Sequence, residues 1–374
     1  MQVLQTTLLT GPYDWDPALL PRAEFEARLA RVRASFGDAD ALIVHGDSGD
    51  HGALAYLTGL APKLDRALAL VPRTGALRLL TQGTEYMIPA AKRLTWVEDV
   101  RLLANIAAIL GDWLPEQGLT SRATLGIWGG AAMPRVLHAG IERALAPGGR
   151  IVALDAVLDP IRRRKTPVER SLLKRASAIL DAAAASFLAT ARAGAGNRSA
   201  ALAAERTAYA QGAQDARIAA SLGHGGAPLP LDGARDDRVD PLLAGIAVQF
   251  NGYWAEGFVT AAAAKGQAAA HAEAGLAAAL KAARAGLAAP TLYRAAAEAL
   301  GPCAPHRLMQ GRIGHAIGLS LEEQPFQDDA HRLEPDGVYV LTVGAQGQGT
   351  DAAVASAMIA VDAAGIEVMW KAEA

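Results

Sequence analysis

Residues 314–326 read Gly-His-Ala-Ile-Gly-Leu-Ser-Leu-Glu-Glu-Gln-Pro-Phe, so a lone histidine, His315, is followed closely by two adjacent acids, Glu322 and Glu323. An imidazole has an unperturbed pKa near neutrality and can both accept and return a proton. A lone histidine can equally be a packed, hydrogen-bonded side chain without a chemical role. A carboxylate beside it can bind a cation or, once its pKa is raised by burial, act as a base. The segment therefore holds candidate acid/base residues.

The surrounding residues predict an α+β domain with helices grouped about a mostly antiparallel sheet. Thr166, followed three residues later by Glu169, has the spacing of a helix-capping box, and a long helix should begin there. Strand-like apolar runs occupy residues 246–250, 338–343 and 357–361, and helix-favouring stretches occupy residues 168–193, 200–211, 271–288 and 291–300. Alanine is frequent in these helices, which favours helix but obscures where each one ends.

The first part of the chain predicts a separate α/β domain. Apolar residues recur at helical spacing in residues 24–36 and are followed by short apolar runs that alternate with helical or turn-rich segments. These strand-like runs lie at residues 41–44, 67–71, 77–80, 125–128 and 151–154. We place the boundary at residue 155, which gives domains of residues 1–155 and 156–374. The basic run at residues 162–165 is then interpreted as a solvated connector.

Composition excludes several classes of protein. A chain of 374 residues that is 51% hydrophobic is expected to form two cores. A formal net charge of −2 provides no basic field for nucleic acid, so no nucleic-acid partner is expected. The single cysteine, Cys303, cannot form an internal disulfide and fits a cytoplasmic protein. The N-terminal residues do not predict a secretory signal, and no apolar stretch reaches the length of a membrane span.

Six short patterns occur along the chain in an order that resembles the M24 family, which includes aminopeptidase P, prolidase and creatinase. They lie at residues 55–59 (Ala-Tyr-Leu-Thr-Gly), 164–169 (Arg-Lys-Thr-Pro-Val-Glu), 251–253 (Asn-Gly-Tyr), 314–319 (Gly-His-Ala-Ile-Gly-Leu), 323–326 (Glu-Gln-Pro-Phe) and 333–337 (Leu-Glu-Pro-Asp-Gly). The likeness covers nearly the whole chain. It implies a creatinase-type N-terminal domain, a C-terminal domain with the pita-bread fold, and a homodimer.

The resemblance also implies five metal-ligand positions, because members of the family usually hold two divalent ions with two aspartates, one histidine and two glutamates. The histidine matches at His315 and the first glutamate at Glu323, which we prefer to Glu322 for that reason. The second aspartate falls on Glu256, whose extra methylene displaces the carboxylate. The first aspartate falls on Gly245 and the second glutamate on Ser356, and neither can act as a carboxylate ligand. We therefore predict a site without metal or other cofactor, with weak binding of one ion as the alternative.

Four further features depart from the family pattern or have an open role. His224 lies in a glycine-rich turn a few residues before the position at which relatives carry a substrate-contacting histidine. It could fill that role in a rebuilt loop, or be an ordinary loop histidine. Arg312 could bind a substrate carboxylate or lie free on the surface. We include Glu322 with these two residues as candidate substrate-binding groups. The glycine-rich residues 344–349 stand where relatives carry Glu-Pro-Gly, and are interpreted as a flexible loop.

Two classes of function fit these residues. The leading hypothesis is a metal-independent hydrolase of a C–N bond in a small, polar, nitrogen-containing substrate, by likeness to creatinase, which works without metal. His315 or His224 would move the proton, while Glu256 and Glu323 would hold a cationic substrate. The alternative is a non-catalytic protein that binds a small ligand or peptide. A metal-dependent Xaa-Pro aminopeptidase or prolidase is disfavoured for want of ligands.

Overall fold

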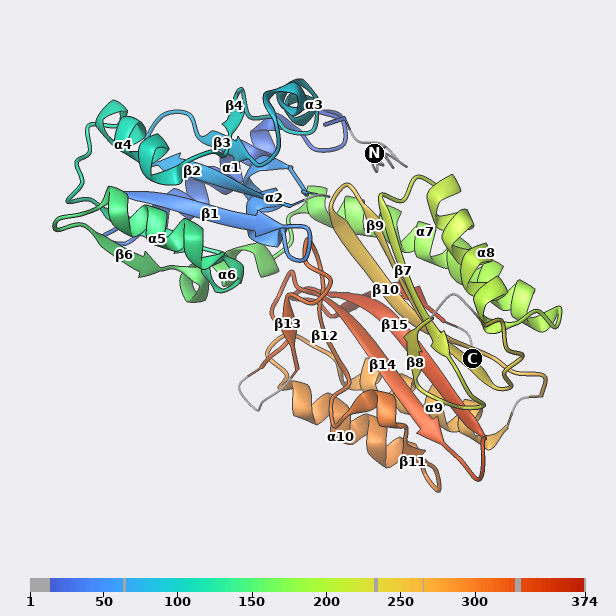
Figure 1. Cartoon of the computed structure of the whole chain (residues 1–374). Helices are drawn as coiled ribbons and strands as arrows, with labels where there is room; N and C mark the ends of the chain where they lie inside the picture. The colour runs from blue at the N-terminus through green and yellow to red at the C-terminus, as the bar shows by residue number, and fades with distance from the viewer. Residues whose placement is uncertain (1–13, 63–64, 232–234, 265, 327–330, 373–374) are drawn as a thin grey trace. The chain divides into compact units, whose positions relative to one another are not determined.

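The computed structural model describes residues 14–372 except 63–64, 232–234, 265 and 327–330. Residues 1–13, which entered the prediction that no secretory signal is present, lie outside the described residues. The chain divides into two compact units, Tyr13–Arg162 and the residues from Arg163 onward (Figure 1).

The division falls after residue 162 because helix α6 (Asp155–Arg163) is held by the first unit over most of its length. The Trp128 indole donates to Asp159 at 2.8 Å, and the Gly129 backbone N–H donates to Asp155 at 2.8 Å. Leu158 is fully buried. These contacts lie downstream of the boundary predicted at residue 155.

The first unit is a six-stranded mixed sheet flanked by helices, in the strand order β4-β3-β2-β1-β5-β6. Strand β1 pairs antiparallel with β2 and parallel with β5, so it lies inside the sheet and is buried along nearly its whole length. The strands are β1 (Ala41–Asp47), β2 (Arg66–Pro72), β3 (Arg78–Thr81), β4 (Asp99–Leu102), β5 (Thr124–Trp128) and β6 (Arg150–Ala153). The helices before α6 are α1 (Arg22–Ala34), α2 (Gly52–Thr58), α3 (Ile88–Arg93), α4 (Ile106–Glu116) and α5 (Arg135–Ala144), with short 3₁₀ turns η1 (Glu85–Met87) and η2 (Gly130–Ala132).

In its described residues the second unit has two antiparallel sheets and four α-helices, whose arrangement Figure 1 shows. One sheet has the order β10-β9-β7-β8, and the other has the order β13-β12-β14-β15-β16, with β11 paired to β14. The strands are β7 (Asp215–Ser221), β8 (Pro228–Pro230), β9 (Leu242–Phe250), β10 (Tyr253–Ala261), β11 (Ala304–Pro305), β12 (Gly314–Ala316), β13 (Gln324–Pro325), β14 (Val338–Gln346), β15 (Ala352–Val361) and β16 (Ile366–Lys371). The helices are α7 (Pro167–Arg192), α8 (Asn197–Ala210), α9 (Gln267–Ala282) and α10 (Ala289–Ala299), with a 3₁₀ turn η3 (Arg307–Met309).

The start of α7 confirms the predicted capping box. The Glu169 backbone N–H donates to the Thr166 hydroxyl at 3.3 Å, and the Thr166 N–H donates to the Glu169 carboxylate at 3.0 Å. Helix α7 packs against β9 and β10, while α9 packs on one face of β14 and β15 and also against α10. Strand β15 also lies against β10, where the Thr260 hydroxyl of β10 binds the backbone of Val354 in β15. An α/β unit followed by an α+β unit is the predicted fold class, which the structure confirms.

Candidate functional site

The structure brings together two of the candidate residues, Glu256 of β10 and His315 of β12. Their Oε2 and Nε2 atoms lie 3.0 Å apart, and their side chains are only 14% and 16% exposed. The two atoms lie within ion-pairing distance but form no aligned hydrogen bond, because neither has a hydrogen-bond partner of suitable geometry among the described residues. A carboxylate at this distance can stabilise an imidazolium, which is what a histidine becomes after it accepts a proton.

The position of the first expected aspartate is filled by a neighbouring aromatic ring. Gly245 lies in β9 directly opposite Phe258 of β10. A Cβ atom at residue 245 would come within 2.7 Å of the Phe258 ring, closer than real Cβ contacts. An aspartate could therefore be placed here only if Phe258 moved.

The position of the last expected glutamate is part of a closed hydroxyl pair. Ser356 is fully buried, and its hydroxyl donates to the Leu341 carbonyl at 3.0 Å. Its oxygen lies 3.1 Å from the Thr342 hydroxyl on the adjacent strand. Since the serine proton goes to Leu341, Thr342 is the donor in this second contact. The hydroxyl pair satisfies its own hydrogen bonds and supplies no carboxylate for a metal.

Glu323, the third candidate catalytic residue, is engaged by a lysine. Its Oε2 accepts from Lys165 Nζ at 2.6 Å, its Oε1 accepts from the Leu319 backbone N–H at 3.1 Å, and both charged side chains are 1% exposed. The interpretation of residues 162–165 as a solvated connector is therefore wrong for Lys165, and also for Arg162, which is buried. The Glu323 carboxylate thus binds the ammonium group of Lys165, in the place of the cationic substrate that the sequence predicted for it.

Gly344, which stands in the segment where relatives carry Glu-Pro-Gly, is covered by His306. A Cβ at Gly344 would lie 2.7 Å from the His306 Cβ. The buried imidazole lies 3.1 Å through Nε2 from the Gly225 carbonyl, and its Nδ1 accepts from the Leu308 N–H at 3.2 Å. Because Nδ1 accepts, the neutral tautomer with a proton on Nε2 fits this environment. Sequence analysis did not single out His306.

Burial lowers the pKa of His306 below its ordinary value of 6.5, so the second unit should lose stability in mild acid. Below about pH 6.5 the unfolded chain binds a proton that the folded chain does not, and the free energy of unfolding then falls as the pH falls toward the folded-state pKa. His306→Gln, which cannot take up this proton, should flatten the dependence. Urea unfolding midpoints between about pH 5 and about pH 8 measure it. His138→Gln, at an exposed position, is the control, and parallel curves for wild type and His306→Gln would contradict the assignment.

The three candidate substrate-binding residues lie at more exposed positions. Arg312 and Glu322 face each other at 3.5 Å across a partly exposed ion pair. His224 is exposed, and its Nδ1 lies 2.7 Å from the carbonyl oxygen and 2.9 Å from the backbone nitrogen of Asp240. The structure thus pairs Glu322 with Arg312 and holds His224 against the backbone of Asp240, beyond strand β8.

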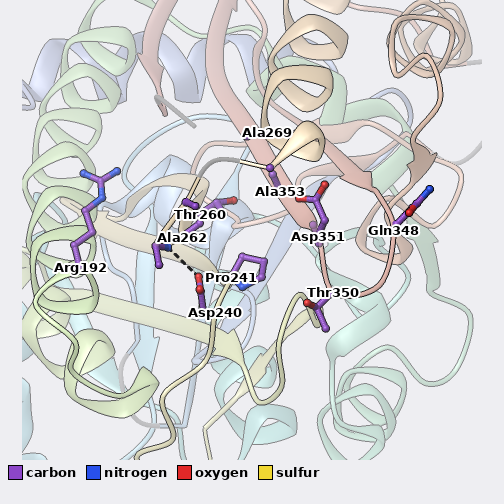
Figure 2. Close-up of a pocket in the computed structure, with 14 residues that line it drawn as sticks. Arg192, Asp240, Pro241, Thr260, Ala262, Ala269, Gln348, Thr350, Asp351 and Ala353 are labelled. Atoms are coloured by element: carbon purple, nitrogen blue, oxygen red, sulfur yellow. Dashed lines mark hydrogen bonds between the residues drawn. The ribbon is translucent and has the colours of Figure 1, made fainter.

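A cavity of about 480 Å³ in the second unit lies beside the end of β10, the start of β15 and the first turn of α9 (Figure 2). Its two acids already serve the backbone: Asp240 accepts from the Ala263 N–H at 2.9 Å, and Asp351 accepts from the Ala268 N–H at 3.1 Å. None of the candidate residues from sequence analysis lines this cavity. The cavity and the Glu256–His315 pair are therefore separate features of the unit.

The residues present do not fit the two-metal centre that the resemblance implies. Among the described residues, no group of three or more histidine, cysteine, aspartate or glutamate side chains is arranged to hold a metal ion. Divalent ions of this kind need several oxygen or imidazole ligands. Glu256 and His315 supply two, while Glu323 is neutralised by Lys165.

Comparison with known families identifies the second unit. Residues 171–367 match the model of metallopeptidase family M24, over more than half of the chain. The chain belongs to family M24. Hydrolysis is the reaction class that M24 membership supports, and the ligand set described above departs from the M24 pattern.

Solved structures with the M24 fold resemble the whole chain. An Xaa-Pro dipeptidase from Bacillus anthracis is 18% identical with a TM-score of 0.73, over 92% of this chain and 97% of that protein. The prolidase of Pyrococcus horikoshii is 18% identical with a TM-score of 0.73, over 93% and 99%. An X-Pro aminopeptidase from Thermotoga maritima is 19% identical with a TM-score of 0.72, over 91% and 97%. At these identities the likeness shows the fold alone, and it confirms the predicted pita-bread architecture.

No curated protein sequence matches the chain. Of the helices in the described ranges, none combines the length and apolar character needed to cross a membrane.

Proposed function

We propose that this M24 protein is a metal-independent hydrolase that cleaves a C–N bond in a small, polar, nitrogen-containing substrate. The observation that carries the proposal is the 3.0 Å contact between His315 and Glu256, in a site where two expected ligand positions have no carboxylate. An acid/base pair of this kind can activate water without a metal ion.

The reaction needs only water and one proton carrier. His315 accepts a proton from water as the water oxygen forms a bond to the electrophilic carbon of the substrate. The same proton then passes to the nitrogen as the C–N bond breaks, so the histidine ends the cycle as it began. Glu256 lies beside the imidazole and stabilises its cationic state between the two transfers.

Metal analysis tests the first part of this proposal. After dialysis, the purified protein should contain far less than one Mn, Co, Zn or Fe per chain, because Gly245 and Ser356 offer no carboxylate and Glu323 is bound by Lys165. Its turnover, once found by screening amides, ureas, guanidines and dipeptides, should survive treatment with EDTA. Two tightly bound ions per chain, or full loss of activity in EDTA with recovery on adding metal, would overturn the metal-independent reaction.

A non-catalytic binding protein is the second candidate, favoured by the filling of one expected ligand position. The Phe258 ring occupies the space that an aspartate side chain at residue 245 would need. A compound that binds the wild-type protein, does not bind His315→Gln, and is never converted would support this candidate. Conversion of any such compound at a rate that depends on His315 would support the hydrolase.

The similar protein from Bacillus anthracis is an Xaa-Pro dipeptidase, so a dipeptide belongs in the substrate screen. Homodimer formation and a cytoplasmic location stay predictions of the sequence.

A further inference from the structure

Lys165 is a buried cation that hydrogen bonds connect, through Glu323, to the segment carrying His315. The sequence had predicted that it lies in a solvated connector. Lys165 lies next to Thr166, the residue that caps α7, and its side chain is 1% exposed. Its backbone N–H donates to the Asp336 carbonyl at 2.8 Å, and its ammonium lies 2.6 Å from Glu323 Oε2. Lys165 is therefore fixed in position by one contact of its backbone and one of its side chain.

Glu323, whose carboxylate binds Lys165, is hydrogen-bonded to the backbone of the segment that follows His315. The Glu323 backbone N–H donates to the Ala316 carbonyl at 2.8 Å, directly after His315. The other carboxylate oxygen of Glu323 accepts from the Leu319 N–H at 3.1 Å. Glu323 thereby closes the turn between β12 and β13 at two points, and Lys165 sets the position of its carboxylate.

The same turn reaches the strand that carries Glu256. The Trp254 N–H of β10 donates to the Gly318 carbonyl at 2.7 Å, two residues before Glu256. Gly318 is required for this arrangement, since a Cβ there would lie 2.4 Å from Glu323 Oε1 and 2.8 Å from Lys165 Nζ. The turn at residues 316–319, which the Lys165–Glu323 ion pair holds in place, therefore connects β12, which carries His315, with β10, which carries Glu256.

We propose that Lys165 is a positioning residue, which acts through Glu323 and the 316–319 turn to fix the contact between His315 and Glu256. Its importance for turnover rests on the proposed function, but its effect on the His315 side chain does not. Glu323 acts with it as a positioning residue and does not hold substrate.

The test is the NMR signal of the His315 imidazole in full-length protein labelled at histidine, assigned by its loss in His315→Gln. Lys165→Met should move the signal by more than its line width, because Glu323 Oε2 loses the ammonium group that fixes its position. The deciding variant is Lys165→Met/Glu323→Leu, in which an apolar pair replaces the charges and thermal stability should recover, since no buried charge is left unpaired. We expect the signal to stay displaced in this double variant, because the bond to Leu319 is absent.

Two controls separate positioning from folding. Arg78→Met breaks an ion pair with Asp99 and Glu116 in the first unit, and should lower the melting temperature without moving the His315 signal. Gly318→Ala, which crowds the ion pair, should displace the signal. A wild-type His315 signal in the stable double variant would overturn the proposal. Displaced signals together with the absence of turnover in every protein, wild type included, would uphold the positioning role and reject the hydrolase.

Discussion

Replacing His315 by glutamine should abolish turnover and leave the protein folded. Glutamine keeps the approximate size and hydrogen-bonding capacity of histidine but cannot exchange a proton. Removal of one acid/base group typically lowers the rate about 100- to 10,000-fold. The position is 16% exposed and makes no aligned hydrogen bond through Nε2 with the described residues, so the melting temperature should change little. The measurement is kcat and melting temperature on the substrate found by screening.

Glu256→Gln is the matched variant for the other side of the pair. It should lower kcat in the same direction, and the double variant should lose less than the product of the two single effects, because the residues act as a unit. Ligand affinity should fall much less than kcat in both single variants. A His315→Gln protein that melts earlier yet is fully active per folded molecule would show that His315 is structural.

Lys165→Met should cost the second unit more stability than any other single change considered above. It leaves the Glu323 carboxylate in a site that is 1% exposed with its ammonium partner gone. Loss of one partner from a buried ion pair destabilises a protein by about 3–5 kcal/mol. For a domain of this size that corresponds to a fall of roughly 6–20 °C in melting temperature. Differential scanning calorimetry measures the change in the transition of the second unit.

Arg78→Met provides the comparison for Lys165→Met. Arg78 also bridges acids, but Asp99 and Glu116 are 34% and 46% exposed, so water can solvate them when the guanidinium is removed. Its effect should be several-fold smaller. A Lys165→Met protein that loses less than about 1 kcal/mol, the value of an exposed pair, would show that water or another group compensates Glu323.

Local patterns were sufficient to predict much of the fold. The capping box at Thr166 needs only four neighbouring residues, and apolar runs such as 41–44 and 338–343 are strands in the structure. Strands β7 and β8 were missed, because residues 215–221 are only half-buried and β8 is three residues long. Helix α9 begins at Gln267, four residues before the predicted start, since alanine on every face gives no periodicity from which to locate an end.

The candidate site was predictable only where a family motif supplied the positions. Gly245, Glu256 and Ser356 were located by counting from such motifs. Lys165 was missed because it is one of four consecutive basic residues, and its partner Glu323 lies 158 residues away in the sequence. Which cation of such a run becomes buried depends on tertiary contacts. His306 was missed for the same reason, because its role depends on the absence of a side chain at Gly344.

The contact between the Phe258 ring and Gly245 makes the residue tolerated at position 245 depend on the residue at position 258. Because the aromatic ring occupies the space of an aspartate side chain, Gly245→Asp alone would press a carboxylate against that ring unless Phe258 moved. Replacing Phe258 by a smaller residue would clear the space, at the loss of a partly buried ring that packs against the cluster of Leu243, Ala352 and Val354. The side chains at residues 245 and 258 are therefore coupled, so a carboxylate can be introduced at residue 245 only together with a change at residue 258 or a movement of its ring.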